Sequence, residues 1–231
     1  MLNFDDLIGE EYFESLLASR VSYLRVINTS PDVNVNIYVN GVLFASNVRY
    51  LSYSRYRPVA PGRYDIAVFP MAGALRPLKT QTVVIQPRTF VTFAVYGLRA
   101  QINARTLIDS SMGAPRGRSS FKMAHFAPTA PAVDLFANNK KIFDDVKYGE
   151  VTKYEDVAAG SYSFQLKKYD TGQVLYTLPT QRLIADNTYT AFVTGLPNGT
   201  PALRMTFIID GRSALREQNR LRDQTRLRDT D

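Results

Sequence analysis

Apolar and polar residues alternate with a period of two along much of the chain after residue 22. In the clearest run, branched apolar residues occupy every second position and asparagine or tyrosine stands between them: Val33, Val35, Ile37, Val39. Successive side chains of a β-strand point to opposite faces, so this pattern predicts a strand with one buried and one solvated face. Asn40-Gly41 comes next and suits the positive φ angles of a tight hairpin turn.

The chain also repeats itself at an offset of 97 to 98 residues, which places residues 59–64 on 157–162 and 95–98 on 193–196. Each copy contains short alternating segments separated by Gly, Pro and Asn, a pattern typical of β-sandwiches. We therefore predict an all-β protein with two tandem β-sandwich domains, at residues 22–109 and 121–210.

Three segments lie outside the two copies. Residues 1–21 carry apolar side chains at helical spacing with acidic residues between them, which predicts a short amphipathic helix. Residues 110–120 are rich in Ser, Gly and Pro, and we expect a flexible, exposed linker. Residues 211–231 are charged and poor in apolar side chains, which predicts a disordered tail or a frayed helix.

Composition excludes several kinds of site. The 231 residues include no cysteine, no tryptophan and one histidine, so disulfides and thiolate or histidine-rich metal sites are excluded, and we expect no cofactor. The start of the chain has no secretory signal pattern, and no apolar stretch is long enough to span a membrane. We expect synthesis in the cytoplasm.

The net charge of +7 is unevenly distributed. Residues 21–109 have ten Lys and Arg against three acidic residues, whereas residues 121–210 have nine of each. The second copy contains a group of acidic residues, at Asp144, Asp145, Glu150, Glu155 and Asp156. A calcium loop would need a different spacing of its oxygens, so we expect a solvated face that could meet the basic first copy of another molecule.

His125 and Asp134 are the only candidate acid–base pair, and they fall on neighbouring predicted strands. Hydrolysis would also need a nucleophile or metal and an oxyanion site, and no known catalytic motif is present. Asn28 stands in place of His125 in the first copy. Because asparagine cannot act as a base, we predict that the pair fixes a turn by hydrogen bonds and that the protein is not an enzyme.

Each copy begins with a recognisable sequence motif, RVINTSPD…VNIYVNG from Arg25 in the first and HFAPTAPAVDLFAN from His125 in the second. Tyrosines and a glycine recur further on, at Tyr50, Tyr56, Gly62 and Tyr64 and at Tyr148, Tyr154, Gly160 and Tyr162. These features resemble a bacterial family of domains of unknown function, number forty-three ninety-seven. The resemblance implies immunoglobulin-like or transthyretin-like β-sandwiches and surface-associated or short two-copy proteins. It implies no activity, and the first copy departs from the pattern at Asn28 and Asn36.

Residues 49–57 interleave arginines with tyrosines, a composition suited to binding sugars, acidic polymers or other proteins: Arg49, Tyr53, Arg55, Tyr56, Arg57. Tyr50 and Tyr56 recur in the second copy and fit a role in the fold instead. We find no motif for specific nucleic-acid recognition.

We therefore expect a non-enzymatic structural or interaction protein of a bacterial surface layer, cell wall or spore coat. It would act through protein–protein contacts, by self-association or with other surface or coat proteins. The alternative is a module that binds carbohydrate or an anionic polymer through residues 49–57. An outer spore layer would suit a chain made in the mother-cell cytoplasm, an argument by analogy.

Overall fold

The computed structural model describes residues 20–71 and 75–228. The described chain is mostly β, with four four-stranded sheets that form two sandwich-like units. The amphipathic helix predicted over residues 1–21 falls outside the described residues, except for its last two positions.

The first sandwich contains sheets of strand order β4-β1-β7-β8 and β3-β2-β5-β6. Its elements are β1 (Ser22–Asn28), β2 (Val35–Val39), β3 (Val42–Val48), β4 (Arg57–Val59), β5 (Gly62–Pro70), β6 (Lys79–Ile85), β7 (Phe90–Tyr96), the 3-10 helix η2 (Arg99–Gln101) and β8 (Asn103–Asp109).

The second sandwich repeats this order as β12-β9-β15-β16 and β11-β10-β13-β14. Its elements are β9 (Arg118–His125), β10 (Val133–Ala137), β11 (Lys140–Val146), β12 (Glu155–Ala158), β13 (Gly160–Lys168), β14 (Val174–Leu183), β15 (Thr188–Thr194), β16 (Arg204–Ile209) and the helix α2 (Gly211–Arg228).

Two details differ from the sequence-based expectation. Strand β9 begins at Arg118, so the last residues of the predicted linker 110–120 are strand, and Ser119 and Ser120 are buried. Of the two alternatives for the tail, the structure has a helix over Gly211–Arg228, and the disordered alternative does not apply there.

Local sequence explains why the two copies fold alike. Asn40 and Gly41 have φ angles of 49° and 78°, and Asn138 and Asn139 occupy the equivalent hairpin turn with 45° and 67°. The recurring tyrosine of each copy closes the turn before its fifth strand: the Tyr64 and Tyr162 hydroxyls donate to Ala60 O and Ala158 O, each over 2.7 Å. In both sandwiches the first and seventh strands pair in parallel, and the other pairs are antiparallel.

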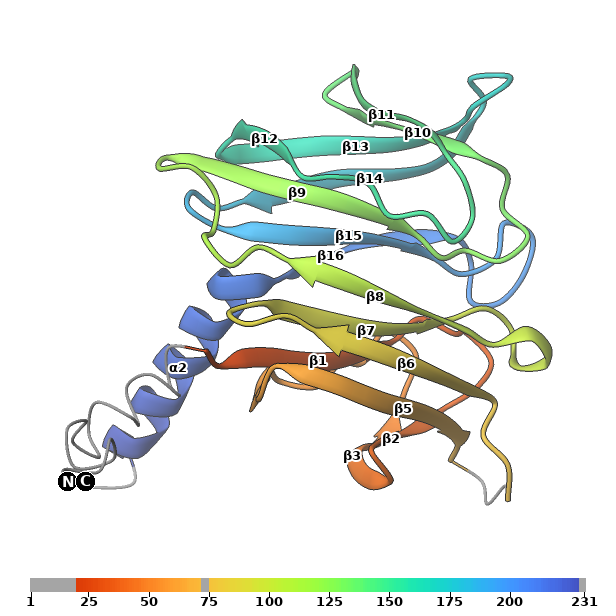
Figure 1. The fold of residues 1–231 in the computed structure, drawn as a ribbon. Helices are drawn as coiled ribbons and strands as arrows, with labels where there is room; N and C mark the ends of the chain where they lie inside the picture. Colours follow the sequence, from red (N-terminus) through yellow and green to blue (C-terminus); the bar gives the residue numbers. More distant parts are fainter. Residues whose placement is uncertain (1–19, 72–74, 229–231) are drawn as a thin grey trace, which may run out of the picture.

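The two sandwiches stack with sheet β4-β1-β7-β8 facing sheet β12-β9-β15-β16 (Figure 1). A third hydrophobic cluster, separate from the core of each sandwich, fills this interface with side chains from both sheets: Ile27, Ala94, Leu107, Ala124, Phe126, Phe192, Ile208. Tyr96 of the first sandwich stacks on Phe126 of the second, with ring centroids 4.4 Å apart. The facing sheets are therefore buried on both sides, and the described part of the molecule has four stacked layers of sheet.

Candidate functional site

Charged side chains lie inside the interface between the two sandwiches, beside its apolar cluster. Arg25 on β1 and Lys122 on β9 are each 2% exposed, Asp109 at the end of β8 is 3% exposed, and Asp210 after β16 is 0% exposed. Charges are rarely buried unless they are paired and hydrogen-bonded, because desolvation costs several kcal/mol per ion. We call these four residues, with Tyr56, Tyr154, Thr92 and Thr190, the interdomain network.

The first half of the interdomain network is centred on Asp109. Its Oδ2 accepts hydrogen bonds from the Tyr56 hydroxyl, over 2.6 Å, and from the Thr92 hydroxyl. Arg25 Nε donates to Thr92 Oγ1, and its Nη1 crosses the interface to donate to Ile209 O, both over 2.8 Å. The Arg25 guanidinium also lies over the Tyr56 ring, 4.5 Å from its centroid.

The second half repeats the first with different residues. Asp210 Oδ2 accepts a hydrogen bond from the Thr190 hydroxyl over 2.6 Å. Lys122 Nζ crosses the interface to donate to Ile108 O over 2.7 Å and lies 4.8 Å from the Tyr154 ring centroid. The Tyr154 hydroxyl accepts from the Ser110 N–H over 3.2 Å. In the same way, the Tyr56 hydroxyl accepts from the Gly211 N–H over 3.0 Å. The interface therefore has an internal two-fold pattern, made from equivalent positions of the two copies.

The pattern is broken at one point. Lys122 Nζ forms an ion pair with Asp109 Oδ1 over 2.7 Å. Within the described residues, the corresponding atoms Arg25 Nη2 and Asp210 Oδ1 are buried without a hydrogen-bond partner. The network thus holds two cations and two carboxylates, but only one close ion pair.

This asymmetry separates the two carboxyl groups electrostatically. Burial alone would raise the pKa of Asp109, but the charges of Lys122 and Arg25 outweigh burial and hold it below its usual value. Burial raises the pKa of Asp210, and the negative charge of Asp109 raises it further. Burial also raises the pKa values of the Tyr56 and Tyr154 phenols, so both keep their protons at neutral pH.

The helix α2 extends the contact from the second sandwich to the first. Gln218 bonds the backbone of Tyr56 twice, with its Oε1 accepting from Tyr56 N and its Nε2 donating to Tyr56 O, both over 3.1 Å. The helix starts at Gly211, whose φ angle is +54°, and a Cβ at this position would lie 2.1 Å from Ser110 O. Only glycine allows the helix to begin so close to the first sandwich.

The structure separates the five predicted binding residues of segment 49–57. Tyr56 is 3% exposed and belongs to the interdomain network. Tyr53 and Arg55 are exposed and, with Tyr56, line a pocket of about 210 Å³ between this segment and α2. Arg57 is exposed on the edge strand β4, over the Phe44 ring, and Arg49 is exposed outside this pocket.

His125 and Asp134 each bond to the backbone near their own strand. His125 Nε2 lies 3.0 Å from Pro131 O, and Asn28 Nδ2 of the first copy donates to the equivalent carbonyl, Val33 O, over 2.7 Å. Asp134 Oδ1 accepts from Asp145 N over 3.0 Å, and its Oδ2 pairs with Lys141. Burial lowers the pKa of His125, so its ring is neutral at neutral pH.

The sequence patterns described above do not point to Asp109, Asp210, Arg25 or Lys122. The repeat offset changes from 98 to 101 residues before the last strand of the second copy, which hides the match of residues 107–109 to 208–210. The available signal was an Ile-Asp pair followed by a small residue at the end of each copy.

Two properties of the described residues bear on possible functions. Within residues 20–71 and 75–228 there is no group of three or more His, Asp or Glu side chains placed to hold a metal ion. No helix in that part of the chain has the length and apolar character needed to cross a membrane.

The family model for the domain of unknown function DUF4397 matches the chain twice, at residues 22–136 and 119–222. The chain therefore belongs to the DUF4397 family and contains two copies of its domain. No curated protein sequence matches it significantly.

Solved structures give distant matches. The C-terminal domain of AlgF from P. aeruginosa is 18% identical over 38% of this chain and 98% of its own, with a TM-score of 0.31. A putative cell adhesion protein from Bacteroides fragilis is 11% identical over 82% of this chain and 98% of its own, with a TM-score of 0.21. A family CBM26 domain from Eubacterium rectale is 10% identical over 84% and 99%, with a TM-score of 0.26. These scores are too low to support an argument about function.

Proposed function

We propose that the protein is a non-enzymatic structural or interaction protein of a bacterial surface layer, cell wall or spore coat, acting through protein–protein contacts. The Asp109 and Asp210 carboxyl groups and the Tyr56 phenol, whose pKa values are shifted by burial and neighbouring charges, are buried and hydrogen-bonded within the interdomain network. They join the two sandwiches into one body. Asp109 and Tyr154 also line a hollow of about 550 Å³ beside residues 110–115, but Asp109 is only 3% exposed there. A subunit of this kind is suited to an assembly that must keep its shape.

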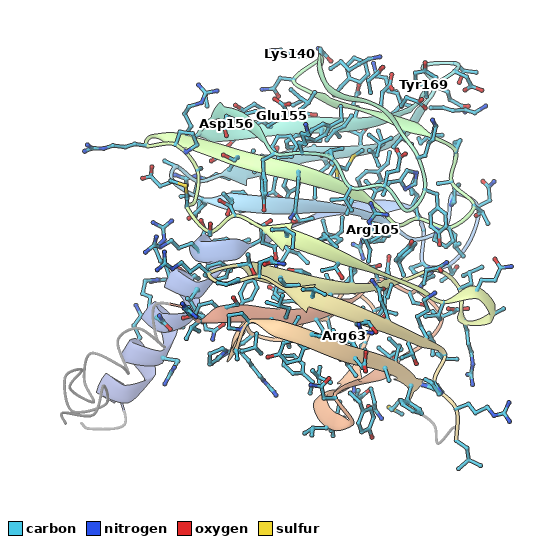
Figure 2. The ribbon with its side chains drawn as sticks, in the orientation of Figure 1. Arg63, Arg105, Lys140, Glu155, Asp156 and Tyr169 are labelled. Carbon is cyan, nitrogen blue, oxygen red and sulfur yellow. The ribbon has the colours of Figure 1, made fainter. Side chains whose placement is uncertain are left out.

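The observation that carries this proposal is the charge difference between equivalent edge strands. Strand β4 is an edge of the first sandwich and carries the exposed Arg57. The equivalent edge β12 of the second sandwich carries Glu155 in its place, followed by Asp156. Figure 2 shows Glu155 and Asp156 on the upper sandwich, whereas the labelled arginines, Arg63 and Arg105, belong to the lower one.

Opposite charges on equivalent edges favour a head-to-tail contact between molecules, with β4 of one molecule against β12 of the next. Such a contact joins two different surfaces, so it builds open chains unless a rotation closes a ring. Pro58 in β4 has no N–H to donate, so we expect side chains rather than a continuous sheet to form the contact. The partners would be further copies of this chain or other surface or coat proteins with similar edges.

Of the two sandwich types considered, we propose the transthyretin-like one. A constant-type immunoglobulin domain has seven strands in antiparallel sheets. Each sandwich here has eight strands in two four-stranded sheets, with a parallel β1–β7 or β9–β15 pair. We also propose that the protein is made in the cytoplasm and then joins the coat or cell surface, a location inferred from the assembly role.

The alternative function, binding of carbohydrate or an anionic polymer by segment 49–57, is supported by the pocket that Tyr53 and Arg55 line. The burial of Tyr56 weakens it, because this ring is not open to a polymer. The double variant Arg55→Ser/Arg57→Ser tests it, since cell-wall binding that survives this change would exclude the alternative.

A charge-swap experiment tests the leading proposal. Sedimentation velocity over a hundred-fold range of concentration should show growth of large species for the native chain, and Glu155→Arg should return it to monomer. Adding Arg57→Glu to Glu155→Arg should restore assembly, because the charges are exchanged but remain complementary. A native chain that stays monomeric at all concentrations, or a double variant no better than the single one, would contradict the proposal. Asp170→Arg, on an exposed loop, is the control and should assemble normally.

A further inference from the structure

The outer face of the first sandwich contains a hollow of about 500 Å³. Its lining comes from β2 and its hairpin, with Asn36, Tyr38 and Gly41, and from β5 and its end, with Ala67, Phe69 and Met71. The intervening residues Ile37 and Val68 point into the core, so strand alternation directs the lining side chains outward. The volume is in the range of small-molecule sites, roughly 300–1,000 Å³.

Two aromatic rings give the hollow its shape. Tyr38 stands opposite Ala67, and Asn36 opposite Phe69, in the register of β2 and β5. The Tyr38 and Phe69 rings lie 5.3 Å apart between centroids and at 73° to each other. The small side chain of Ala67 leaves space beside these rings, which stand as two walls almost at a right angle.

The equivalent face of the second sandwich is built differently. Gln165 replaces Ala67 and Lys167 replaces Phe69, while Phe136 replaces Tyr38. Lys167 Nζ lies 4.2 Å from the centroid of the Phe136 ring, so an ammonium group covers this ring. The open pair of rings is therefore a property of the first sandwich and not a requirement of the fold.

The lining chemistry favours one class of ligand. In the part of the chain that the structure describes, the lining contains no charged side chain, so a phosphate or carboxylate would find no cationic partner there. Asn36 uses its Oδ1 to accept from Asn47 N over 2.8 Å, and its amide nitrogen has no hydrogen bond among the described residues. Rings that pack against C–H groups, combined with free amide and hydroxyl donors, match a sugar ring, which has apolar faces and hydroxyl edges.

We propose that this hollow binds a neutral hexopyranose unit of a glycan, with one of the Tyr38 and Phe69 rings against a face of the sugar, the other ring against its edge, and Asn36 donating to a hydroxyl. This site is separate from segment 49–57 and from the β4 and β12 edges. It would attach an assembled or single molecule to a polysaccharide, so head-to-tail contact and glycan binding can fail independently.

Retention of the full chain on insoluble polysaccharides tests the proposal, with starch, cellulose and chitin as probes. We expect retention on at least one of them. Phe69→Lys removes one ring contact and should lower retention about two- to tenfold. Ala67→Gln, made separately, fills the space beside the rings and should lower retention by a similar factor. The second sandwich already holds these residues at the equivalent positions, so the strands can accommodate them.

Phe136→Ala, on the equivalent face of the second sandwich, is the matched control and should keep full retention. Thermal unfolding of each variant checks that it is folded. The proposal is overturned if none of the three polysaccharides retains the native chain. It is also overturned if the folded Ala67→Gln and Phe69→Lys variants are both retained as well as the native chain, or if Phe136→Ala lowers retention as much as they do.

Discussion

The two sandwiches have the same strand order. Their side chains match at the interface between them but differ on their outer faces. At the interface their chemistry matches: tyrosine, threonine and aspartate occupy equivalent places in both, and a cation, Arg25 or Lys122, precedes them. These buried side chains must provide hydrogen-bond partners for one another, which restricts the residues that can replace them.

On the outer faces the match is lost. The edge strand β3 has no charged residue and exposes Val42 and Leu43, whereas its equivalent β11 begins with Lys140 and Lys141. An exposed position makes few demands on its side chain, so each sandwich can present a different surface. We infer that the matched residues hold the two sandwiches together, and that recognition depends on the positions where the copies differ.

The largest expected effect comes from breaking the close ion pair. Asp109→Asn leaves Lys122 buried without its counter-charge, and we expect a loss of about 3–5 kcal/mol in the free energy of unfolding. Asp210→Asn should cost about 1 kcal/mol or less, because Asp210 has an unpartnered oxygen and a raised pKa that makes its charge unfavourable. Urea denaturation measures both, and equal losses would contradict the asymmetry of the network.

The contributions of Asp210 and Asp109 to the free energy of unfolding should change with pH in opposite directions. The raised pKa of Asp210 gives stability that is complete below the unfolded value of about 3.9 and is lost as pH rises through the folded value. The lowered pKa of Asp109 gives stability that is present above about 3.9 and is lost as pH falls through the folded value.

The unfolding free energy of the native chain relative to Asp210→Asn should therefore fall as the pH rises from about 4. Relative to Asp109→Asn, it should fall as the pH decreases below about 4. Denaturation curves across this range measure both differences. If the unfolding free energy of the native chain relative to Asp210→Asn rose with pH instead, the folded protein would stabilise the charged form of Asp210, which would contradict this account.

A smaller effect is expected at the end of the interface. The Tyr50 and Thr194 hydroxyls, from different sandwiches, hydrogen bond over 2.8 Å. Tyr50→Phe should lower the free energy of unfolding by about 0.5–1.5 kcal/mol, the usual cost of one such bond. The equivalent Tyr148 packs edge to face on Tyr96, so Tyr148→Phe should change stability less. The reverse order in thermal unfolding would contradict the assigned contacts.

The smallest effect on stability is expected at the outer edge. Val42→Lys/Leu43→Lys gives β3 the two lysines with which β11 begins. Both positions are exposed, so we expect a change within about 0.5 kcal/mol. A larger loss, measured by urea denaturation, would mean that this edge is constrained by the fold.

The sequence allows most of the sandwich architecture to be predicted, because each half-buried strand alternates and Asn40-Gly41 specifies its turn. The interface is harder to predict, since β1 is buried on both faces and its pattern, with Arg25 among apolar residues, does not alternate. The pattern of residues 211–231 does not decide between a helix and a disordered tail, because docking of the helix depends on Gln218 reaching Tyr56, a long-range contact. Local sequence patterns do not predict a hydrogen bond between residues that are 162 positions apart in the chain.

Hydrogen exchange followed by mass spectrometry in increasing denaturant tests most directly whether the interdomain network makes the two sandwiches one cooperative unit. The account predicts that core amides of β7 and β15 lose protection together in the native chain, and at different denaturant concentrations in Asp109→Asn. Separate loss of protection in the native chain would show that the sandwiches unfold independently, and would contradict the account.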